Sequence, residues 1–159
     1  MDKVLDLFAG SGALGFEALS RGAVQVDFIE HDRLAVAAIT QNAEKLGVEA
    51  QVRVRCEKVA AWAKRRLPEA PYDLVFIDPP YADSAAQASA LLIASEVLAN
   101  EGLVVVEHER MDELPLEIGA DRKLTKLTKL TKIDQRHYGQ TAVTFYQRDP
   151  RDLRGDVDG

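Results

Sequence analysis

The tetrapeptide Asp78-Pro79-Pro80-Tyr81 carries the residue types in this chain that best suit chemistry on an amine. Proline has no N–H, so Pro79 and Pro80 present only carbonyl oxygens, and a residue before proline is held extended. A carboxylate beside a carbonyl suits a ligand group with two hydrogens to donate, namely an exocyclic amine. Tyr81 adds a ring on which a base can stack. The alternative is a plain turn, but the position directly after the apolar run 74–77 favours a ligand site.

A second stretch suits the binding of a cofactor. The apolar run 4–8 stops at Gly10-x-Gly12-x-x-Gly15, and a helical pattern follows at once. Glycines let the backbone approach a ligand closely, and a helix start adds free N–H groups and a positive dipole end. The spacing also fits the dinucleotide fingerprint, so the turn alone does not distinguish between nucleotide cofactors.

Three acidic residues stand near the same predicted strands. Glu30 ends the second strand pattern, where a carboxylate can accept both hydroxyls of a ribose. Asp6 lies inside an apolar strand and needs partners, which the turn amides or a ligand ammonium would supply. Glu57 follows the third strand pattern and is either an acceptor for an adenine amine or a surface acid, with the two readings evenly balanced.

Length, composition and charge restrict the classes of protein to which this sequence can belong. The 159 residues predict one domain over 1–147, followed by a polar, disordered tail over 148–159. No apolar run reaches the ~18 residues of a membrane span and no signal peptide is visible, and with a single cysteine a reducing cytoplasm is the expected location, away from membranes. A single cysteine excludes an internal disulfide, and the histidines show no metal spacing, so no metal is expected. The net charge of −6 weighs against nucleic-acid binding.

Strand and helix patterns alternate through five rounds up to residue 106, which predicts a parallel sheet with helices on both faces. Ligands bind such sheets at the carboxyl ends of the strands, so the turn 6–10 should share one rim with Glu30, Glu57 and Asp78. The Leu-Thr-Lys tract 123–132 predicts a solvated edge strand, with a basic RNA-facing edge as the less favoured interpretation. The alternating stretch 141–146 predicts a last strand that pairs back with this tract.

The two motifs together give the sequence a family resemblance. Asp6-Leu-Phe-Ala-Gly-Ser-Gly with a downstream Asp78-Pro-Pro-Tyr resembles class I S-adenosylmethionine-dependent methyltransferases that act on exocyclic amines. The longer stretch 4–23, with 76–81 and 138–146, is closer still to the RsmD-type bacterial 16S ribosomal RNA guanine-N2 methyltransferases. Members of that family carry a basic amino-terminal segment before the first strand, whereas here Met1 stands almost on that strand, so the resemblance is to a form lacking the segment.

The resemblance implies a Rossmann-like α/β fold with a seven-stranded, mostly parallel sheet whose last strand is antiparallel. It implies S-adenosylmethionine as cofactor, and 16S rRNA or small-subunit ribosomal particles as partners of a monomeric enzyme. Asp78 to Tyr81 would hold the target guanine, and Asp78 would also border the cofactor. The other cofactor residues would be Asp6, Phe8, Ala9, Gly10 and Gly12 around the methionine part, Glu30 and His31 near the ribose, and Glu57 and Lys58 beside the adenine.

Other functions remain open from the sequence. A DNA adenine or protein glutamine N-methyltransferase would use the same acceptor pair. An NAD-dependent dehydrogenase would account for the glycines and Glu30, but it gives Asp78-Pro79-Pro80-Tyr81 no role. A non-catalytic ribosome-assembly module would bind the cofactor or the ribosome without chemistry.

Overall fold

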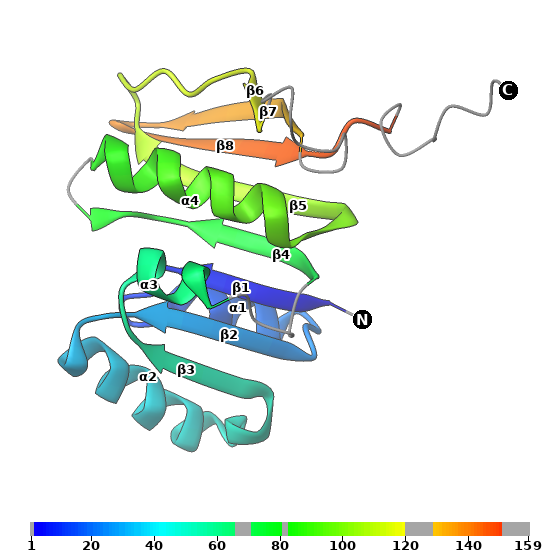
Figure 1. The fold of residues 1–159 in the computed structure, drawn as a ribbon. Helices are drawn as coiled ribbons and strands as arrows, with labels where there is room; N and C mark the ends of the chain where they lie inside the picture. Colours follow the sequence, from blue (N-terminus) through cyan, green and yellow to red (C-terminus); the bar gives the residue numbers. More distant parts are fainter. Residues whose placement is uncertain (1, 66–70, 81–82, 120–128, 151–159) are drawn as a thin grey trace, which may run out of the picture.

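Strands and helices alternate along the first two thirds of the chain in the computed structural model, which describes residues 2–65, 71–80, 83–119 and 129–150 (Figure 1). The elements are β1 (Lys3–Leu7), α1 (Ala13–Ser20), β2 (Gln25–Glu30), α2 (Arg33–Leu46), the 3-10 turn η1 (Glu49–Gln51), β3 (Val52–Cys56), α3 (Val59–Lys64), β4 (Tyr72–Ile77), α4 (Ser84–Val97), β5 (Leu98–Glu109), β6 (Glu117–Ile118), β7 (Leu130–Tyr138) and β8 (Thr141–Gln147).

All the strands join one sheet in the order β3-β2-β1-β4-β5-β8-β7-β6. The first five pair in parallel, while β8 runs antiparallel between β5 and β7, as the prediction of an antiparallel last strand required. The predicted count of seven strands is wrong, because the described residues form eight. The additional strand is β6, only two residues long, whose pairing with β7 is too short to leave an alternating pattern in the sequence.

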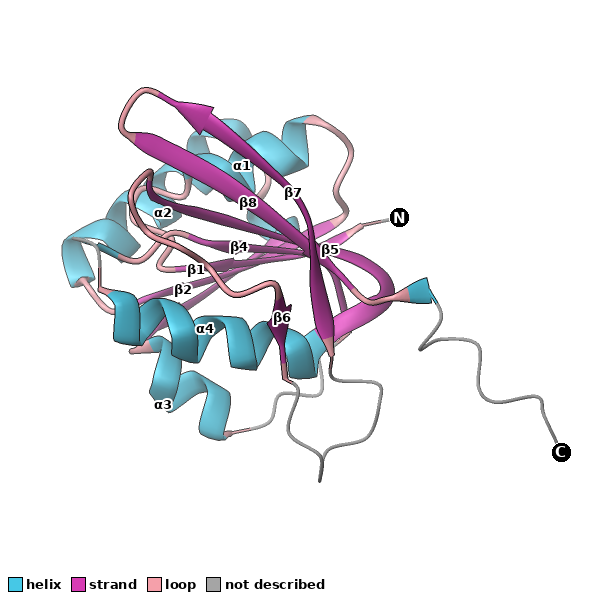
Figure 2. Cartoon of the chain, turned by 90° about the horizontal axis from the view of Figure 1, so that it is seen from above, coloured by secondary structure: helices cyan, strands magenta, loops and turns pink. Residues whose placement is uncertain are grey.

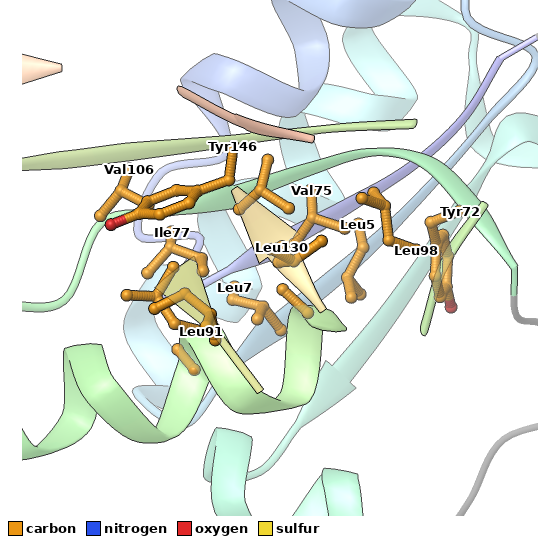
Figure 3. Close-up of a cluster of buried hydrophobic side chains, with 14 of the residues drawn as sticks. Leu5, Leu7, Tyr72, Val75, Ile77, Leu91, Leu98, Val106, Leu130 and Tyr146 are labelled. Carbon is orange, nitrogen blue, oxygen red and sulfur yellow. The ribbon is translucent and has the colours of Figure 1, made fainter. Parts of the chain in front are cut away.

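Helices cover both faces of the parallel part. Figure 2 shows α1 and α2 on one side of the strands and α3 and α4 on the other. The larger core lies under α3 and α4, and Figure 3 shows its side chains converging from β1, β4 and β5 onto α4. Burial of each large apolar side chain there contributes about 1.5–3 kcal/mol. The fully enclosed members include Leu5, Leu7, Val75, Leu91 and Val106.

Local sequence signals fix the helix ends beside the ligand rim. The Asp32 carboxylate accepts a 2.9 Å hydrogen bond from the Leu34 N–H and caps the start of α2, and the far end of α2 is at Gly47, which has a left-handed φ of 66°. Asp83 caps α4 in the same way through the Ala86 N–H at 2.9 Å. These caps hold the loops after β2 and β4 at the carboxyl edge of the sheet.

The carboxyl-terminal part departs from the edge-strand prediction for the tract. Leu130 is fully buried in the core, because β7 lies between β8 and β6 at this point. The predicted pairing with the last strand is confirmed, since Thr131 and Lys132 pair with β8. Positions 123–128 of the tract lie outside the described residues, as does 151–159 of the predicted tail. Arg148, where that tail begins, is buried and donates to the carbonyl oxygens of Ser95 and Leu98.

Candidate functional site

The turn after β1 has an unusual backbone. Phe8 adopts a left-handed φ of 60°, and Gly10 and Gly12 follow with φ of 57° and 82°. A left-handed conformation is unfavourable for a bulky residue such as Phe8, and such residues concentrate at functional sites. The Ala9 N–H is held by the Ile29 carbonyl at 3.1 Å, and the Gly12 N–H by the Ala9 carbonyl at 2.9 Å. These bonds hold the turn against the end of β2.

The third glycine of the motif serves packing. A Cβ on Gly15 would lie 2.3 Å from a ring carbon of Phe28 and 2.8 Å from Val26 Cγ1. Only glycine therefore lets α1 lie this close to β2. The Gly15 N–H donates to the Asp6 carboxylate at 3.1 Å, which ties the first turn of α1 to β1.

Glu30 organises the loops around it. Its carboxylate accepts hydrogen bonds from three backbone N–H groups: Gly10 at 2.8 Å, and His31 and Asp32 at 3.0 Å each. The side chain is buried, 8% exposed. A carboxylate has about four acceptor positions, so roughly one remains for a ligand. The predicted ribose contact stays a prediction, and the structure adds that Glu30 also holds the glycine turn in place.

Glu57 presents an acceptor without a donor. One oxygen, Oε2, pairs with the Arg65 guanidinium, while the other, Oε1, is buried and has no hydrogen-bond partner in the described part of the chain. The Glu57 N–H donates to the Glu30 carbonyl at 3.0 Å, which holds the ends of β2 and β3 together. A buried carboxylate oxygen without a partner is costly, so this atom suits a ligand N–H.

A cavity of about 280 Å³ joins these residues at the carboxyl edge of the sheet. Apolar side chains form most of its wall, and charged groups stand at its edges, which suits a flat aromatic group that carries polar edge atoms. Its lining residues are Phe8, Ile29, Glu30, His31, Glu57, Lys58, Val59, Ala60, Pro80, Asp83, Ala86 and Ser89.

Asp6 is an acid enclosed by protein, 2% exposed. The pKa of its carboxyl is raised to about 7: burial is the largest cause, the Gly15 N–H opposes it by lowering the pKa, and the negative charges of Asp78 and Glu30 add to the rise. Three carboxyl groups thus act on one another near the turn. A cationic ligand group in this region would relieve their repulsion.

Asp78 directly follows β4 at the rim. As a residue it is solvent-exposed, yet desolvation of its carboxyl and the charge of Glu107 raise the pKa to about 6. Asp78 and Pro79 line a second cavity of about 210 Å³, and Asp83 lines both this cavity and the first. The two cavities therefore meet at the loop between β4 and α4.

The predicted site residues that the structure describes fall into two groups that the sequence did not distinguish: those that line a cavity and those that do not. Asp6, Ala9, Gly10 and Gly12 line neither cavity; Gly10 is linked to the first one through its hydrogen bond to Glu30, and Asp6 accepts from the Gly15 N–H. His31 is on the cavity wall, its Nδ1 3.5 Å from Glu30 Oε1. Tyr81 falls outside the described residues.

Sequence reasoning missed the wall that α4 supplies, formed by Asp83, Ala86 and Ser89. An Asp followed by a helical pattern is a capping signal that could have placed Asp83 at the rim. No group of three metal-ligating side chains is arranged for a metal ion within the described residues. In that same part of the chain, no helix has the length and apolar character to span a membrane.

The sheet order, with an antiparallel strand inserted beside β5, and the glycine turn at the end of β1 define a Rossmann-like fold of the methyltransferase class. A conserved hypothetical protein from Streptococcus pyogenes superposes with a TM-score of 0.78 at 33% identity, covering 93% of this chain and 86% of that one. A putative methyltransferase, yhhF, from Escherichia coli has a TM-score of 0.77 at 31% identity, covering 93% and 77%.

Sequence comparison gives the family. The family described as conserved hypothetical protein 95 matches residues 1–147. A putative rRNA methyltransferase of Bacillus subtilis, YlbH, is 36% identical over 148 residues, 91% of this chain and 74% of the relative. The ribosomal RNA small subunit methyltransferase D of E. coli is 33% identical over 146 residues, covering 91% and 68%. The chain belongs to this family of RsmD-type proteins, and the resemblance drawn from the two motifs is confirmed.

Proposed function

We propose that this chain transfers a methyl group from S-adenosylmethionine to the exocyclic N2 amine of a guanine in small-subunit ribosomal RNA. The observation that carries the proposal is the meeting of the two cavities at Asp83, with the Asp78 carboxylate and Pro79 lining the second. A cofactor in the first cavity and a base in the second would then face each other across one loop. The names of the family relatives support ribosomal RNA as the substrate.

The residues of the first cavity fit S-adenosylmethionine. The unpartnered Oε1 of Glu57 would accept a hydrogen bond from the adenine amine, between the apolar side chains of Ile29 and Val59. The remaining acceptor position of Glu30 suits a ribose hydroxyl. Asp6 and Glu30 make the turn a favourable place for an ammonium group. The cofactor supplies an electrophilic methyl group on a sulfonium.

Asp78 and Pro79 would act on the amine. Its lone pair is delocalised into the ring, so the amine is a poor nucleophile. Hydrogen bonds to the Asp78 carboxylate and the Pro79 carbonyl would draw its hydrogens out of the ring plane and localise the lone pair. The same acceptors would stabilise the positive charge that develops on nitrogen. With a pKa of about 6, Asp78 is ionised at neutral pH and can receive the proton that the methylated nitrogen releases.

The walls of the site contribute by placement. Holding the two reactants at attack distance supplies much of the acceleration. The target base has to leave its stack to enter the second cavity. A ribosomal RNA substrate favours the cytoplasm, and we expect the chain to act there as a monomer without a metal.

The other functions left open by the sequence are less well supported. A dehydrogenase has no use for the Asp78 and Pro79 acceptors in the second cavity. A DNA adenine or protein glutamine methyltransferase would use them, but the named relatives act on rRNA. A module that binds ribosomal particles without catalysis would need neither the raised pKa of Asp78 nor a second cavity.

The decisive experiment incubates the chain with small-subunit ribosomal particles and methyl-labelled cofactor, and maps the modified base. We expect one guanine to carry label at N2. Label on adenine, or no label although calorimetry shows cofactor binding, would contradict the proposal. Calorimetry with NAD in parallel tests the dehydrogenase alternative.

A further inference from the structure

The second cavity contains more acceptors than the reaction at the amine requires. Beside Asp78 and Pro79 it is lined by Glu107 of β5 and Gln87 of α4. No lysine or arginine is among its described lining residues, whose remaining members are Asp83, His108, Glu109, Asp112 and Thr141. A ligand that fits there must be rich in hydrogen-bond donors or carry positive charge.

Asp78 and Glu107 lie side by side. Ile77, the last residue of β4, pairs with Val106 of β5 in parallel register, and Asp78 and Glu107 are the residues that follow this pair. Neighbouring strands are about 5 Å apart, and both acids line the same cavity. The charge of Glu107 contributes to the raised pKa of Asp78, as expected for carboxylates this close. Neither side chain accepts a hydrogen bond from a described residue.

Gln87 offers an independent sign that the cavity receives a ligand. The residue is only 8% exposed, and it lies one turn after the Asp83 cap of α4. Its backbone N–H bonds to the Asp83 carbonyl at 2.9 Å, while its side-chain amide makes no hydrogen bond to a described residue. The amide belongs to the cavity wall and is open to the cavity, so a ligand there can bond to it.

A metal ion does not account for these groups. The cavity contains several carboxylates, but no three of the described acids, histidines or cysteines are placed to share one ion. An organic donor is the better occupant. Two acceptors next to one amide also match a purine edge more closely than a simple ammonium, which has no acceptor atom for the amide N–H.

Guanine is the nucleobase whose exocyclic amine stands beside a ring N–H, with a carbonyl oxygen, O6, on the far side of it. Adenine and cytosine place a ring nitrogen acceptor next to their amine, and that atom would face a carboxylate unfavourably. We propose that Glu107 and Gln87 determine base specificity, with the Glu107 carboxylate accepting the N1–H of the target guanine and the Gln87 amide donating to its O6. This inference rests on the proposed function and adds the residues that select the base.

The test compares guanine with 2-aminopurine at the target nucleotide of reconstituted small-subunit particles. 2-Aminopurine keeps the amine at C2, but its N1 is an acceptor and it has no O6. We expect the wild-type chain to favour guanine in kcat/KM by about tenfold to a hundredfold. In Glu107→Gln, the new amide can donate to N1 of 2-aminopurine, so this preference should fall at least tenfold. Gln87→Leu should slow methylation of guanine and leave 2-aminopurine unaffected.

Loss of structure would slow both substrates equally, so the ratio of the two rates reports specificity. Glu101→Gln is the matched control, since Glu101 is exposed at the opposite end of β5 and should leave the ratio unchanged. If the wild-type chain methylates guanine but both variants retain its preference within threefold, the inference is wrong and the proposed function stands. If the wild-type chain labels no guanine, the inference falls together with the proposed function.

Discussion

The backbone N–H of Gly10 donates a 2.8 Å hydrogen bond to Oε2 of Glu30 and joins the turn after β1 to the turn after β2. The same carboxylate accepts from the N–H groups of His31 and Asp32 through its other oxygen. Glu30 therefore fixes the backbone on which the first cavity is built. This role is separate from the ribose contact for which the family resemblance suggests Glu30, and the two can be measured apart.

Glu30→Gln should weaken both fold and binding. An amide keeps one oxygen acceptor and places an NH₂ where the other oxygen accepted an N–H, which leaves at least one buried backbone donor unpaired. We expect a loss of about 1–3 kcal/mol in the free energy of unfolding, measured by denaturant titration, and weaker cofactor binding by calorimetry. Glu44→Gln on the exposed side of α2 is the control. An unchanged unfolding midpoint would contradict the structural role of Glu30.

Glu57→Gln should weaken cofactor binding and change the stability of the free protein little. In the absence of ligand, the buried Oε1 of Glu57 has no described partner, and the Arg65 guanidinium that pairs with Oε2 is exposed, so neutralising the Glu57 side chain should cost the free protein little. If that atom accepts the adenine amine, its replacement should weaken cofactor binding by about tenfold, since a hydrogen bond to a charged group contributes about 1.5–3 kcal/mol. Calorimetry measures the affinity and thermal unfolding the stability. Equal affinity in the two proteins would exclude the contact.

Gly15→Ala should destabilise the protein without any change in the cavity walls. The added Cβ would lie 2.3 Å from the Phe28 ring, a contact that forces α1 and β2 apart. We expect a cost of about 1–3 kcal/mol, typical of overpacking. Phe28→Leu in the same chain should recover part of it, since the smaller side chain makes room, although Val26 at 2.8 Å remains. If the losses in the free energy of unfolding from the two substitutions simply add, the Cβ at position 15 does not clash with the Phe28 ring.

The sequence predicted the parts of this molecule that local signals control. The order of strands and helices up to β5 follows from hydrophobic periodicity, and the cap at Asp32 and the stop at Gly47 follow from residue type. Strand β6, which pairs with β7, could not be predicted, because its two residues are too few to show a period and their pairing depends on residues further along the chain.

The candidate site likewise combines features that local sequence signals predict with features that depend on contacts between distant residues. Its motif residues were predicted from their position after strand ends, but the network of Glu30 depends on how two turns approach each other. Likewise, the sequence presents Asp78 and Glu107 as acids 29 positions apart, and only the register of Ile77 with Val106 makes them neighbours. Residue types indicated the chemistry, whereas the sheet register determined which groups act together.

Asp6 should make stability depend on pH in an unusual direction. Its pKa in the folded protein, about 7, lies above the ordinary value of 3.8, so the protonated form is favoured by folding. Its contribution is fully present below about pH 4 and is lost as the pH rises through 7, at most about 4 kcal/mol in total. In Asp6→Asn, the amide oxygen can still accept from Gly15, so this variant mimics neutral Asp6.

The measurement compares the unfolding free energies of Asp6→Asn and the wild-type chain between pH 4 and pH 8, which cancels the titration of the other acids. We expect the variant to be the more stable protein at pH 8 and the difference to vanish towards pH 4. A difference that is constant across this range would mean that Asp6 does not titrate in it.

Asp78 should control the pH dependence of methyl transfer. The proposed mechanism needs its carboxylate as an acceptor, and a pKa of about 6 means that this form is lost as the pH falls from 7 to 5. The rate constant kcat at saturating cofactor should therefore fall about tenfold for each unit below pH 6. Asp78→Asn should lower kcat about 10²–10³-fold, as loss of a transition-state acceptor does, and should remove this inflection.

Asp78→Ala should abolish turnover, while cofactor affinity stays close to that of the wild-type chain because the Glu57 and Glu30 contacts remain. Comparable turnover in Asp78→Ala, or an unchanged pH profile in Asp78→Asn, would show that the amine is activated by another group.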